Sequence, residues 1–286
     1  MPKSMRRFAP RSGACLWMTD QATIAFIPHG GGPLPLMNDR NHENLVRFLR
    51  DYPSTIPKPD AIVVVSAHWE ADEVAITAAS SPTLLFDYYG FPPETYQYQY
   101  PAPGHPQLAE RVHALLSQAG IASRLDPERD FDHGVFVPLM LMYPDAEIPC
   151  IQLSLCSNLD AAHHVRVGKA LAALKSENLL VLGSGFSFHN LPVIMGSRSG
   201  AEDARNREFE AWLAQTCSDV ELAESERERR LVDWVSAPHA RYCHPREEHL
   251  LPLQVCYGIA QAPAQTVFHD TVGGLLTSGY QWISNA

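Results

Sequence analysis

Three histidines in this sequence follow short apolar runs that are typical of buried β-strands. They are His29 after residues 23–28, His68 just past the run that begins at residue 61, and His189 after residues 179–182. A neutral imidazole is the commonest metal ligand in proteins, and several imidazoles at one sheet edge suit iron, zinc, copper or nickel. A lone histidine is more often structural, but three in equivalent positions predict a metal site.

Two further histidines, His244 and His249, lie near the start of the last predicted helix. Side chains share a helix face when they are three or four residues apart, whereas these two are five apart. The spacing also differs from the H-E-x-x-H motif of zinc proteases. We therefore expect at most one of the two to reach the metal site. His133, which precedes Gly134 in a predicted loop, is a weaker candidate.

Motifs for other chemistries are absent or incomplete. The glycines at 30–32 free the backbone for tight turning, but no Lys-Ser/Thr pair follows to make a phosphate-binding loop. Ser184 and Ser187 flank Gly185 without a convincing acid partner, so a serine nucleophile is not predicted. The remaining histidines are expected to be structural or exposed: His42, His105, His113, His163, His164, His239 and His269.

The elements that must position these residues alternate between apolar runs and helical patterns. Residues 61–65 form a continuous β-branched run, which indicates a strand buried on both faces, as in a parallel sheet between helices. Ligands bind at the carboxyl ends of the strands in such α/β sheets. Further strands are predicted at residues 23–28, 74–78, 148–155 and 179–182. Helices are predicted at residues 43–50, 108–119, 161–175 and within 201–234, and residues 244–249 are predicted to open a last helix.

The chain of 286 residues is long enough for one large α/β domain. Residues 1–20 have mixed composition and are expected to form a flexible N-terminal extension, with the catalytic domain at residues 21–286. A segment dense in proline and tyrosine occupies residues 82–106. Loops this long within a compact domain are usually lids or binding loops.

Composition excludes several classes of function. The net charge is −10 and no block of Lys and Arg stands out, so nucleic acid is not an expected partner. No apolar run approaches the ~18 residues of a membrane-spanning helix, and no signal peptide is recognised at the N-terminus. The six cysteines are scattered without a C-x-x-C pair. That pattern favours a cytoplasmic location and argues against a disulfide framework or a thiolate zinc site.

Six short motifs occur in an order that resembles a known family. They are His29-Gly30-Gly31, Ser66-Ala67-His68-Trp69, Tyr100-Pro101-Ala102-Pro103-Gly104, Asp132-His133-Gly134, His189-Asn190-Leu191 and Glu248-His249-Leu250-Leu251-Pro252-Leu253. Together they resemble the class III extradiol ring-cleavage dioxygenases. The 4,5-DOPA dioxygenase branch is the nearer match, and protocatechuate 4,5-dioxygenase is a more distant one. The resemblance extends from about residue 23 to the C-terminus.

The resemblance implies a single α/β domain with a mixed central β-sheet flanked by α-helices on both faces. It implies that His29, His68 and His249 hold one divalent metal ion, Fe(II) for dioxygenase activity. Zn(II) is an alternative, because zinc also accepts three imidazoles. It places His189 beside the metal as an acid/base or a fourth ligand, and His133 near the meeting point of oxygen and substrate as a second catalytic residue.

The implied activity is opening of the ring of a small aromatic diol, a catechol, by O2. The segment 86–106 would form a wall around the aromatic ring, and Arg246 is the nearest candidate to bind a substrate carboxylate, although exposure on a helix surface is the simpler interpretation. Homo-oligomerisation is compatible with this function. Two alternatives stay open, namely a zinc-dependent hydrolase on the same scaffold and a non-catalytic ligand-binding relative.

One motif departs from the family pattern. Chains of the DOPA-dioxygenase branch usually carry His-Gly-Ser-Pro at the first motif, whereas this chain has His29-Gly30-Gly31-Gly32-Pro33. The wider loop is expected to alter the shape of the substrate pocket more than the metal site.

Overall fold

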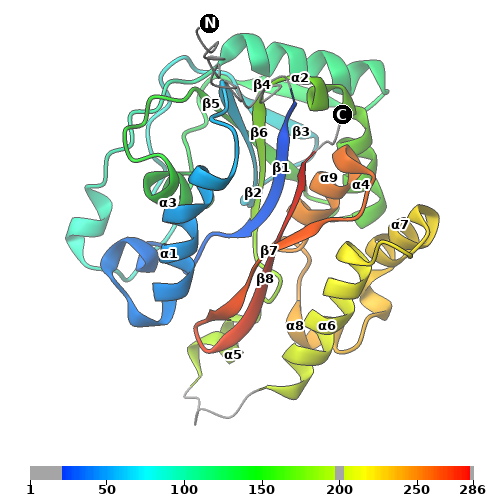
Figure 1. Cartoon of the computed structure of the whole chain (residues 1–286). Coiled ribbons are helices and arrows are strands. Elements are labelled where there is room, and N and C mark those ends of the chain that lie inside the picture. Colours follow the sequence, from blue (N-terminus) through cyan, green and yellow to red (C-terminus); the bar gives the residue numbers. More distant parts are fainter. Residues whose placement is uncertain (1–20, 197–202, 284–286) are drawn as a thin grey trace, which may run out of the picture.

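The structure is a computed structural model that describes residues 21–196 and 203–283. The predicted N-terminal extension at residues 1–20 lies outside these described residues. A central sheet is covered by helices on both of its faces (Figure 1). Within the described ranges, no helix is both long enough and apolar enough to cross a membrane.

The strands of the described residues form one eight-stranded sheet in the order β4-β3-β5-β2-β6-β1-β8-β7. They are β1 (Thr23–Pro28), β2 (Ala61–Ala71), β3 (Val74–Thr77), β4 (Ser123–Asp126), β5 (Cys150–Cys156), β6 (Leu179–Gly185), β7 (Gln265–Val272) and β8 (Leu275–Ile283). The central strands β5, β2, β6 and β1 run parallel, whereas β3 is antiparallel to β5 and β8 is antiparallel to β1 and β7. The predicted single α/β domain with a mixed sheet is therefore confirmed.

Helices connect most of these strands. They are α1 (Glu43–Asp51), α2 (Pro106–Gln118), α3 (His133–Met142), α4 (Ala161–Ala170), α5 (Leu191–Met195), α6 (Ala204–Ser218), α7 (Glu224–Val232), α8 (Ala240–Cys243) and α9 (Leu251–Ala260). Short 3-10 turns lie at Leu34–Met37, Arg40–His42, Tyr52–Thr55, Pro93–Tyr96, Ala172–Ser176 and Trp234–Ser236.

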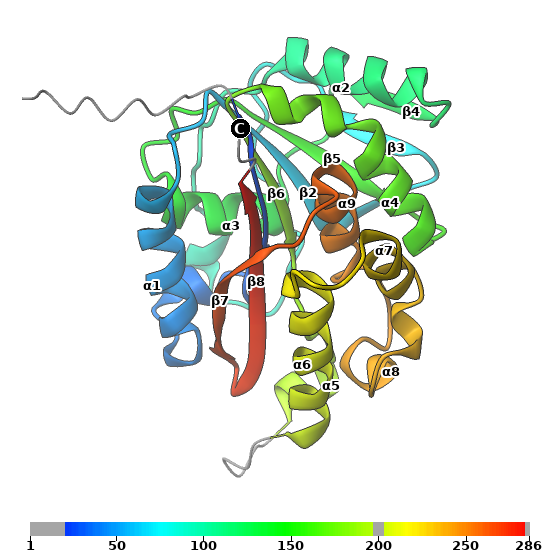
Figure 2. The ribbon, with the colours of Figure 1, turned by 45° about the vertical axis from the view of Figure 1, so that its right-hand side comes forward.

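Alternate residues of the central strands face opposite helical layers, because successive side chains of a strand point to opposite sides. Ile62 and Val64 of β2 pack in the core that includes α1 and α3. Val63 and Val65 pack on the other face with α2, α4 and α9. Figure 2 shows α1 and α3 on one side of the sheet and α4 and α9 on the other. Burial on both faces explains why the run is continuously apolar.

Two C-terminal elements differ from the sequence prediction. The hairpin of β7 and β8 was not predicted, and the last helix begins at Leu251 rather than near His244. Residues 244–250 form turns, in which the backbone N–H groups of Leu250 and Leu251 donate to the carbonyl of Glu247. The proline of the first helical turn is therefore Pro252, a position where its missing N–H removes no helical hydrogen bond.

Two glycines of β6 allow the segment before α9 to approach the sheet. A Cβ atom on Gly185 would lie 2.2 Å from the carbonyl oxygen of His249, and one on Gly183 would lie 2.8 Å from that of Pro252. The N–H of Phe186 donates to the carbonyl oxygen of His249 at 2.9 Å. The two glycines therefore leave room for the backbone of His249 at the end of β6, and the hydrogen bond from Phe186 holds it there.

A buried carboxyl group lies where α6 packs on β8. Glu210 is fully buried, and its Oε2 accepts a hydrogen bond from Ser278 Oγ at 2.6 Å. Its Oε1 atom has no hydrogen-bond partner among the described residues. Burial raises the pKa of Glu210 to about 7, although hydrogen bonds from Ser187 and Ser278 oppose the shift. The group is therefore mostly protonated in the folded protein below neutral pH.

Replacing Glu210 by Gln should raise the stability of the protein more at pH 8 than at pH 5. Between the ordinary glutamate pKa of 4.5 and the folded value of about 7, the unfolded chain binds fewer protons than the folded chain. Stability at this site therefore falls as the pH rises. Each pKa unit corresponds to about 1.4 kcal/mol. The stabilising effect of Glu210→Gln on the free energy of unfolding should therefore differ between pH 5 and pH 8 by on the order of a few kcal/mol.

Urea unfolding of both proteins at pH 5 and pH 8 measures this effect, and the exposed Glu147→Gln serves as the surface control. If the free energies of unfolding of wild type and Glu210→Gln differ by the same amount at the two pH values, the prediction is contradicted.

Candidate metal centre

Strands β1 and β2 bring two of the predicted histidines together. His29 directly follows β1 and is buried. His68 lies inside β2 and not past its end, so that part of the prediction was wrong. Pairing of β2 with β6 ends at Ser66, and its register with β5 is irregular between Val65 and Glu70. This break frees His68 from the regular ladder and lets its side chain join the site.

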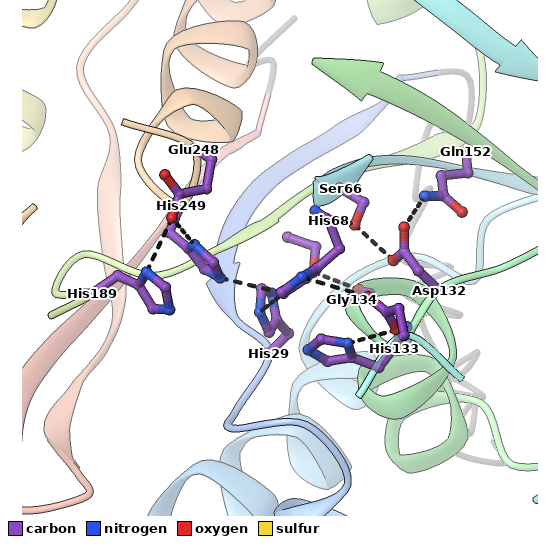
Figure 3. Close-up of polar contacts among 12 residues, drawn as sticks. His29, Ser66, His68, Asp132, His133, Gly134, Gln152, His189, Glu248 and His249 are labelled. Carbon is purple, nitrogen blue, oxygen red and sulfur yellow. Dashed lines mark hydrogen bonds and ion pairs between the residues drawn. The ribbon is translucent and has the colours of Figure 1, made fainter. Parts of the chain in front are cut away.

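Three imidazoles meet at the centre of the site, as Figure 3 shows. The Nε2 atom of His68 lies 3.0 Å from Nε2 of His29 and 3.3 Å from Nε2 of His249. Two nitrogens that bind one ion at about 2.1 Å are separated by roughly 3.0 Å at a right angle and roughly 3.4 Å at a tetrahedral angle. Both separations fit pairs of imidazoles that bind the same divalent ion, with His68 common to the two pairs.

A serine hydroxyl fixes the tautomer of His29. Ser184 Oγ donates its hydrogen to the carbonyl oxygen of Gly134 at 2.5 Å and lies 3.0 Å from Nδ1 of His29. Because this hydroxyl hydrogen is already used, the oxygen accepts a hydrogen bond from Nδ1–H. Nε2 of His29 therefore carries the lone pair that a metal ion needs.

Carboxylates have the same effect on the other two imidazoles. Glu248 Oε1 lies 3.0 Å from Nδ1 of His249, and Asp87 Oδ2 lies 3.5 Å from Nδ1 of His68. Nδ1–H of His249 donates to Glu248, which leaves the lone pair of His249 at Nε2. The contact of His68 with Asp87 is at an ion-pair distance, and the negative charge at 3.5 Å favours the hydrogen of His68 at Nδ1 and the lone pair at Nε2.

The three imidazoles are uncharged near neutral pH. Burial lowers the pKa of His29, His68 and His249 well below the ordinary value of imidazole, and the neighbouring histidines lower each pKa further. Asp87 and Glu248 oppose this shift at His68. Neutral imidazoles are the form in which histidine binds metals, so the chemistry of the donor set fits a metal ion.

His189 lies beside His249 in the close-up view (Figure 3). The two rings stack with their centroids 3.3 Å apart, and Nδ1 of His189 lies 3.2 Å from Oε1 of Glu248. Burial would raise the pKa of Glu248, but the hydrogen bond from His189 and nearby charges lower it. One ionised oxygen therefore orients both rings.

His133 lies on the other side of His29 and His68 (Figure 3). It is the first residue of α3, and its ring centroid is 3.8 Å from that of His68. Its backbone N–H and its Nδ1 lie 3.0 Å and 2.8 Å from Oδ1 of Asp87. Burial would raise the pKa of Asp87, but these hydrogen bonds lower it to about 2. The carboxylate is therefore ionised and fixes the orientation of the His133 ring.

The donor atoms of the site fall into two groups. Within each group, the candidate ligand atoms lie within 4.8 Å of one another; the groups are His29, His68 and His133, and His189, Glu248 and His249. The 3.3 Å contact between the Nε2 atoms of His68 and His249 joins them into one centre. In the second group, the Nδ1 atoms of His189 and His249 both face Oε1 of Glu248. We therefore assign Glu248 as an outer partner that supports His249 and not as a metal ligand.

A buried network holds the backbone of His68. Ser66 Oγ donates to Asp132 Oδ1 at 2.7 Å and accepts from the N–H of His68 at 3.2 Å. Asp132 also accepts hydrogen bonds from Arg129, at 3.1 Å, and from Gln152. Burial and the nearby Asp87 charge raise the pKa of Asp132, against the effects of these partners.

Two other residues considered in the sequence lie outside the centre. Nε2 of His244 donates to the carbonyl oxygen of Ser187 at 2.7 Å, and burial lowers the pKa of His244 to about 3. Arg246 makes two contacts with the carboxylate of Glu70, at 2.5 Å and 2.6 Å, and one with Glu248 at 3.3 Å. In this structure Arg246 thus pairs with carboxylates of the protein itself.

Sequence reasoning gave no role at the site to Asp87 or Ser184. Ser184 is opposite Ile27 in β1 and Ser66 in β2, so the strand register could have revealed it. Asp87 has no such signal, because its contact with His133 spans 46 residues of sequence.

Aromatic rings surround the histidines. Phe186 meets the ring of His29 edge-on at a centroid distance of 5.6 Å. Tyr88 lies 5.9 Å from the ring of His133 and also packs against Phe91. The proline- and tyrosine-rich segment therefore reaches the site through Tyr88.

The α/β sheet and the neutral imidazoles of His29, His68 and His249 define a chain with a candidate metal centre of the kind found in metal-dependent enzymes. Residues 24–277 match the family described as "Catalytic LigB subunit of aromatic ring-opening dioxygenase", and the chain belongs to this family. The resemblance to class III extradiol dioxygenases is thus confirmed.

Similar proteins agree with this assignment. "Dioxygenase tasH" of Hapsidospora irregularis is 38% identical over 281 residues, covering 91% of this chain and 85% of the relative. The "4,5-DOPA dioxygenase extradiol" of Beta vulgaris is 36% identical over 259 residues, covering 89% and 93%. The crystal structure of an uncharacterised protein of Escherichia coli K12 is similar with a TM-score of 0.73 and 32% identity, covering 91% and 98%.

Replacing His29, His68 or His249 by Ala should strip most of the bound metal. Loss of an outer partner of a ligand typically lowers metal affinity by about 10–100-fold, and loss of a ligand itself should lower it at least as much. Elemental analysis after dialysis measures the metal content. The control is His239→Asn, a distant histidine in a left-handed backbone conformation that Asn tolerates. Undiminished metal in any one alanine variant would remove that residue from the ligand set.

Proposed function

We propose that this chain is a metal-dependent extradiol dioxygenase that opens the ring of a small catechol-type diol with O2, and that Fe(II) is its working ion. The observation that carries the proposal is the pair of Nε2 separations of 3.0 Å and 3.3 Å. Family membership and relatives named for 4,5-DOPA support an aromatic diol as the substrate class. Zn(II) is the alternative ion for the same three imidazoles.

His29, His68 and His249 would hold the ion through Nε2. When bound, the ion would supply Lewis acidity and a template that brings the diol and O2 together. The chain's own contribution at these positions is fixed geometry, because each ring is anchored at Nδ1 by Ser184, Asp87 or Glu248.

His189 is the general base of the proposal. Its Nδ1 faces Glu248 at 3.2 Å, which leaves Nε2 to remove a proton from a hydroxyl group of the diol. Stacking on His249 supports a position beside the metal for this nitrogen. A fourth-ligand role would use the same Nε2 atom, and the two roles differ in what happens to metal content when the ring is replaced.

His133 is the second catalytic histidine of the proposal. Asp87 holds its Nδ1 at 2.8 Å, which leaves Nε2 to stabilise an anionic oxygen or to return a proton. Tyr88 and Phe186 would flank the aromatic ring of the substrate and exclude water, since both rings lie beside histidines of the site.

Fe(II)-loaded protein should consume O2 with catechol, protocatechuate or DOPA and form a yellow ring-opened product, whereas tyrosine should give no uptake. A monophenol leaves one oxygen contact and the base unpaired, and such losses can discriminate by about 10⁴-fold or more. An oxygen electrode and absorbance follow the reaction, with His68→Ala as the control. Turnover of tyrosine but of none of the diols would contradict the proposal, and hydrolysis without O2 uptake would favour the zinc hydrolase.

His189→Gln should keep the fold and the metal and lower the turnover number by about 10²–10⁴-fold, the usual contribution of a residue that transfers protons. Steady-state O2 uptake and elemental analysis of the same preparation separate the two roles. If the variant loses its metal as well, His189 is a fourth ligand and not the base.

A further inference from the structure

Two carboxylates occupy equivalent places on opposite sides of the three imidazoles. Asp87 lies between His68 and His133, with Oδ2 3.5 Å from Nδ1 of His68 and Oδ1 2.8 Å from Nδ1 of His133. Glu248 lies between His249 and His189, with Oε1 3.0 Å and 3.2 Å from their Nδ1 atoms. Each carboxylate thus contacts one proposed metal ligand and one proposed catalytic histidine.

We propose that Asp87 is a positioning residue that selects the metal-binding tautomer of His68 and orients His133 at the same time, and that Glu248 does the same for His249 and His189. The proposal rests on the proposed function for the roles of these histidines. Its substance is the selection of tautomers by two shared carboxylates, one of which comes from the aromatic segment 82–106.

The physical reason is that a neutral imidazole has one N–H and one lone pair. An acceptor at Nδ1 places the hydrogen there and leaves the lone pair at Nε2. A donor at Nδ1 reverses this and blocks the nitrogen that faces the metal. Outer partners of this kind typically contribute about 10–100-fold to metal affinity.

Charge supports the same assignment. Three neutral imidazoles leave the charge of a divalent ion uncompensated in a buried site, which is unfavourable without nearby negative charge. Asp132 pairs with Arg129, and Glu70 pairs closely with Arg246, which also lies 3.3 Å from Oε2 of Glu248. Asp87 and Glu248 face the histidines and can balance the ion without binding it.

The two carboxylates use their oxygens differently. Glu248 serves both of its histidines with the single atom Oε1, whereas Asp87 serves His133 with Oδ1 and His68 with Oδ2. An amide has one acceptor oxygen and one donor nitrogen. Gln at position 248 can therefore keep both histidine contacts and loses only the 3.3 Å contact of Oε2 with Arg246, whereas Asn at position 87 cannot keep both of its histidine contacts.

The orientation of the amide in Asp87→Asn is fixed by the protein. The backbone N–H of His133 donates to Oδ1 and must face the amide oxygen, so the amide nitrogen faces His68. The N–H groups of that nitrogen then face Nδ1 of His68 at the 3.5 Å position of Oδ2, which favours the hydrogen of the ring at Nε2. Asp87→Asn and Glu248→Gln thus remove the same charge, and only the first sets a donor against a metal ligand.

The test measures Zn(II) affinity by competition with a chromophoric chelator, in the absence of any catechol. Asp87→Asn should bind Zn(II) at least about tenfold more weakly than Glu248→Gln, at the low end of the effect of an outer partner. The exposed Asp145→Asn is the surface control and should match the wild type. Equal affinities of Asp87→Asn and Glu248→Gln would overturn the proposal.

Long-range 1H–15N correlation spectra of the metal-free protein give a second readout that a purely structural role would not move. The spectrum of His68 should change from the Nδ1–H to the Nε2–H tautomer in Asp87→Asn, and an unchanged tautomer would overturn the proposal. Should Asp87→Asn not fold, Asp87→Ala replaces it; its His68 should show a mixture of tautomers, and a retained Nδ1–H form would overturn the proposal.

These measurements separate the inference from the proposed function. Wild-type protein that binds Zn(II) with the expected tautomers but consumes no O2 with any catechol would contradict only the dioxygenase proposal. Normal O2 consumption together with unchanged Zn(II) binding in Asp87→Asn would contradict only the positioning role.

Discussion

Imidazole lone pairs that point at one another repel, and much of the structure around this site serves to hold them together. Nε2 of His68 lies 3.0 Å and 3.3 Å from the Nε2 atoms of His29 and His249. Burial prevents the rings from relieving the repulsion by taking up protons, because it lowers their pKa values. The acceptors behind each Nδ1 prevent the rings from turning away. A bound cation would turn the repulsion into attraction, so these contacts pre-organise the site for an ion.

The backbone segments that carry these histidines approach one another closely at glycines, where larger residues would not fit. A Cβ atom on Gly134 would lie 2.6 Å from Oγ of Ser66, and one on Gly185 would lie 2.2 Å from the carbonyl oxygen of His249. The first glycine lets the start of α3 reach the middle of β2, and the second lets the turn before α9 reach β6. Ser184 connects the two approaches, since it donates to the carbonyl of Gly134 and accepts from His29.

Local patterns could reveal the α/β class and the histidines after strands, because a doubly buried strand is continuously apolar and its end is a ligand-binding position. The same patterns failed where tertiary contacts decide the outcome. Only Phe268 and Val272 of β7 are buried, so this strand has little apolar signal. The position of His68 depends on a break in strand pairing, and that of Asp87 on a contact across 46 residues; neither is visible in a window of sequence.

The first histidine motif shows how the metal and substrate sides of such a site can vary separately. Gly30 and Gly32 have φ angles of +91° and +53°, values that favour glycine. A Cβ atom on Gly32 would lie 3.3 Å from the ring of Phe91, so the widened loop packs against the aromatic segment 82–106. His29 is held separately, by β1 and by Ser184. A change in the length of this loop therefore alters the aromatic side of the site, while the imidazole keeps its place because the sheet and not the loop anchors it.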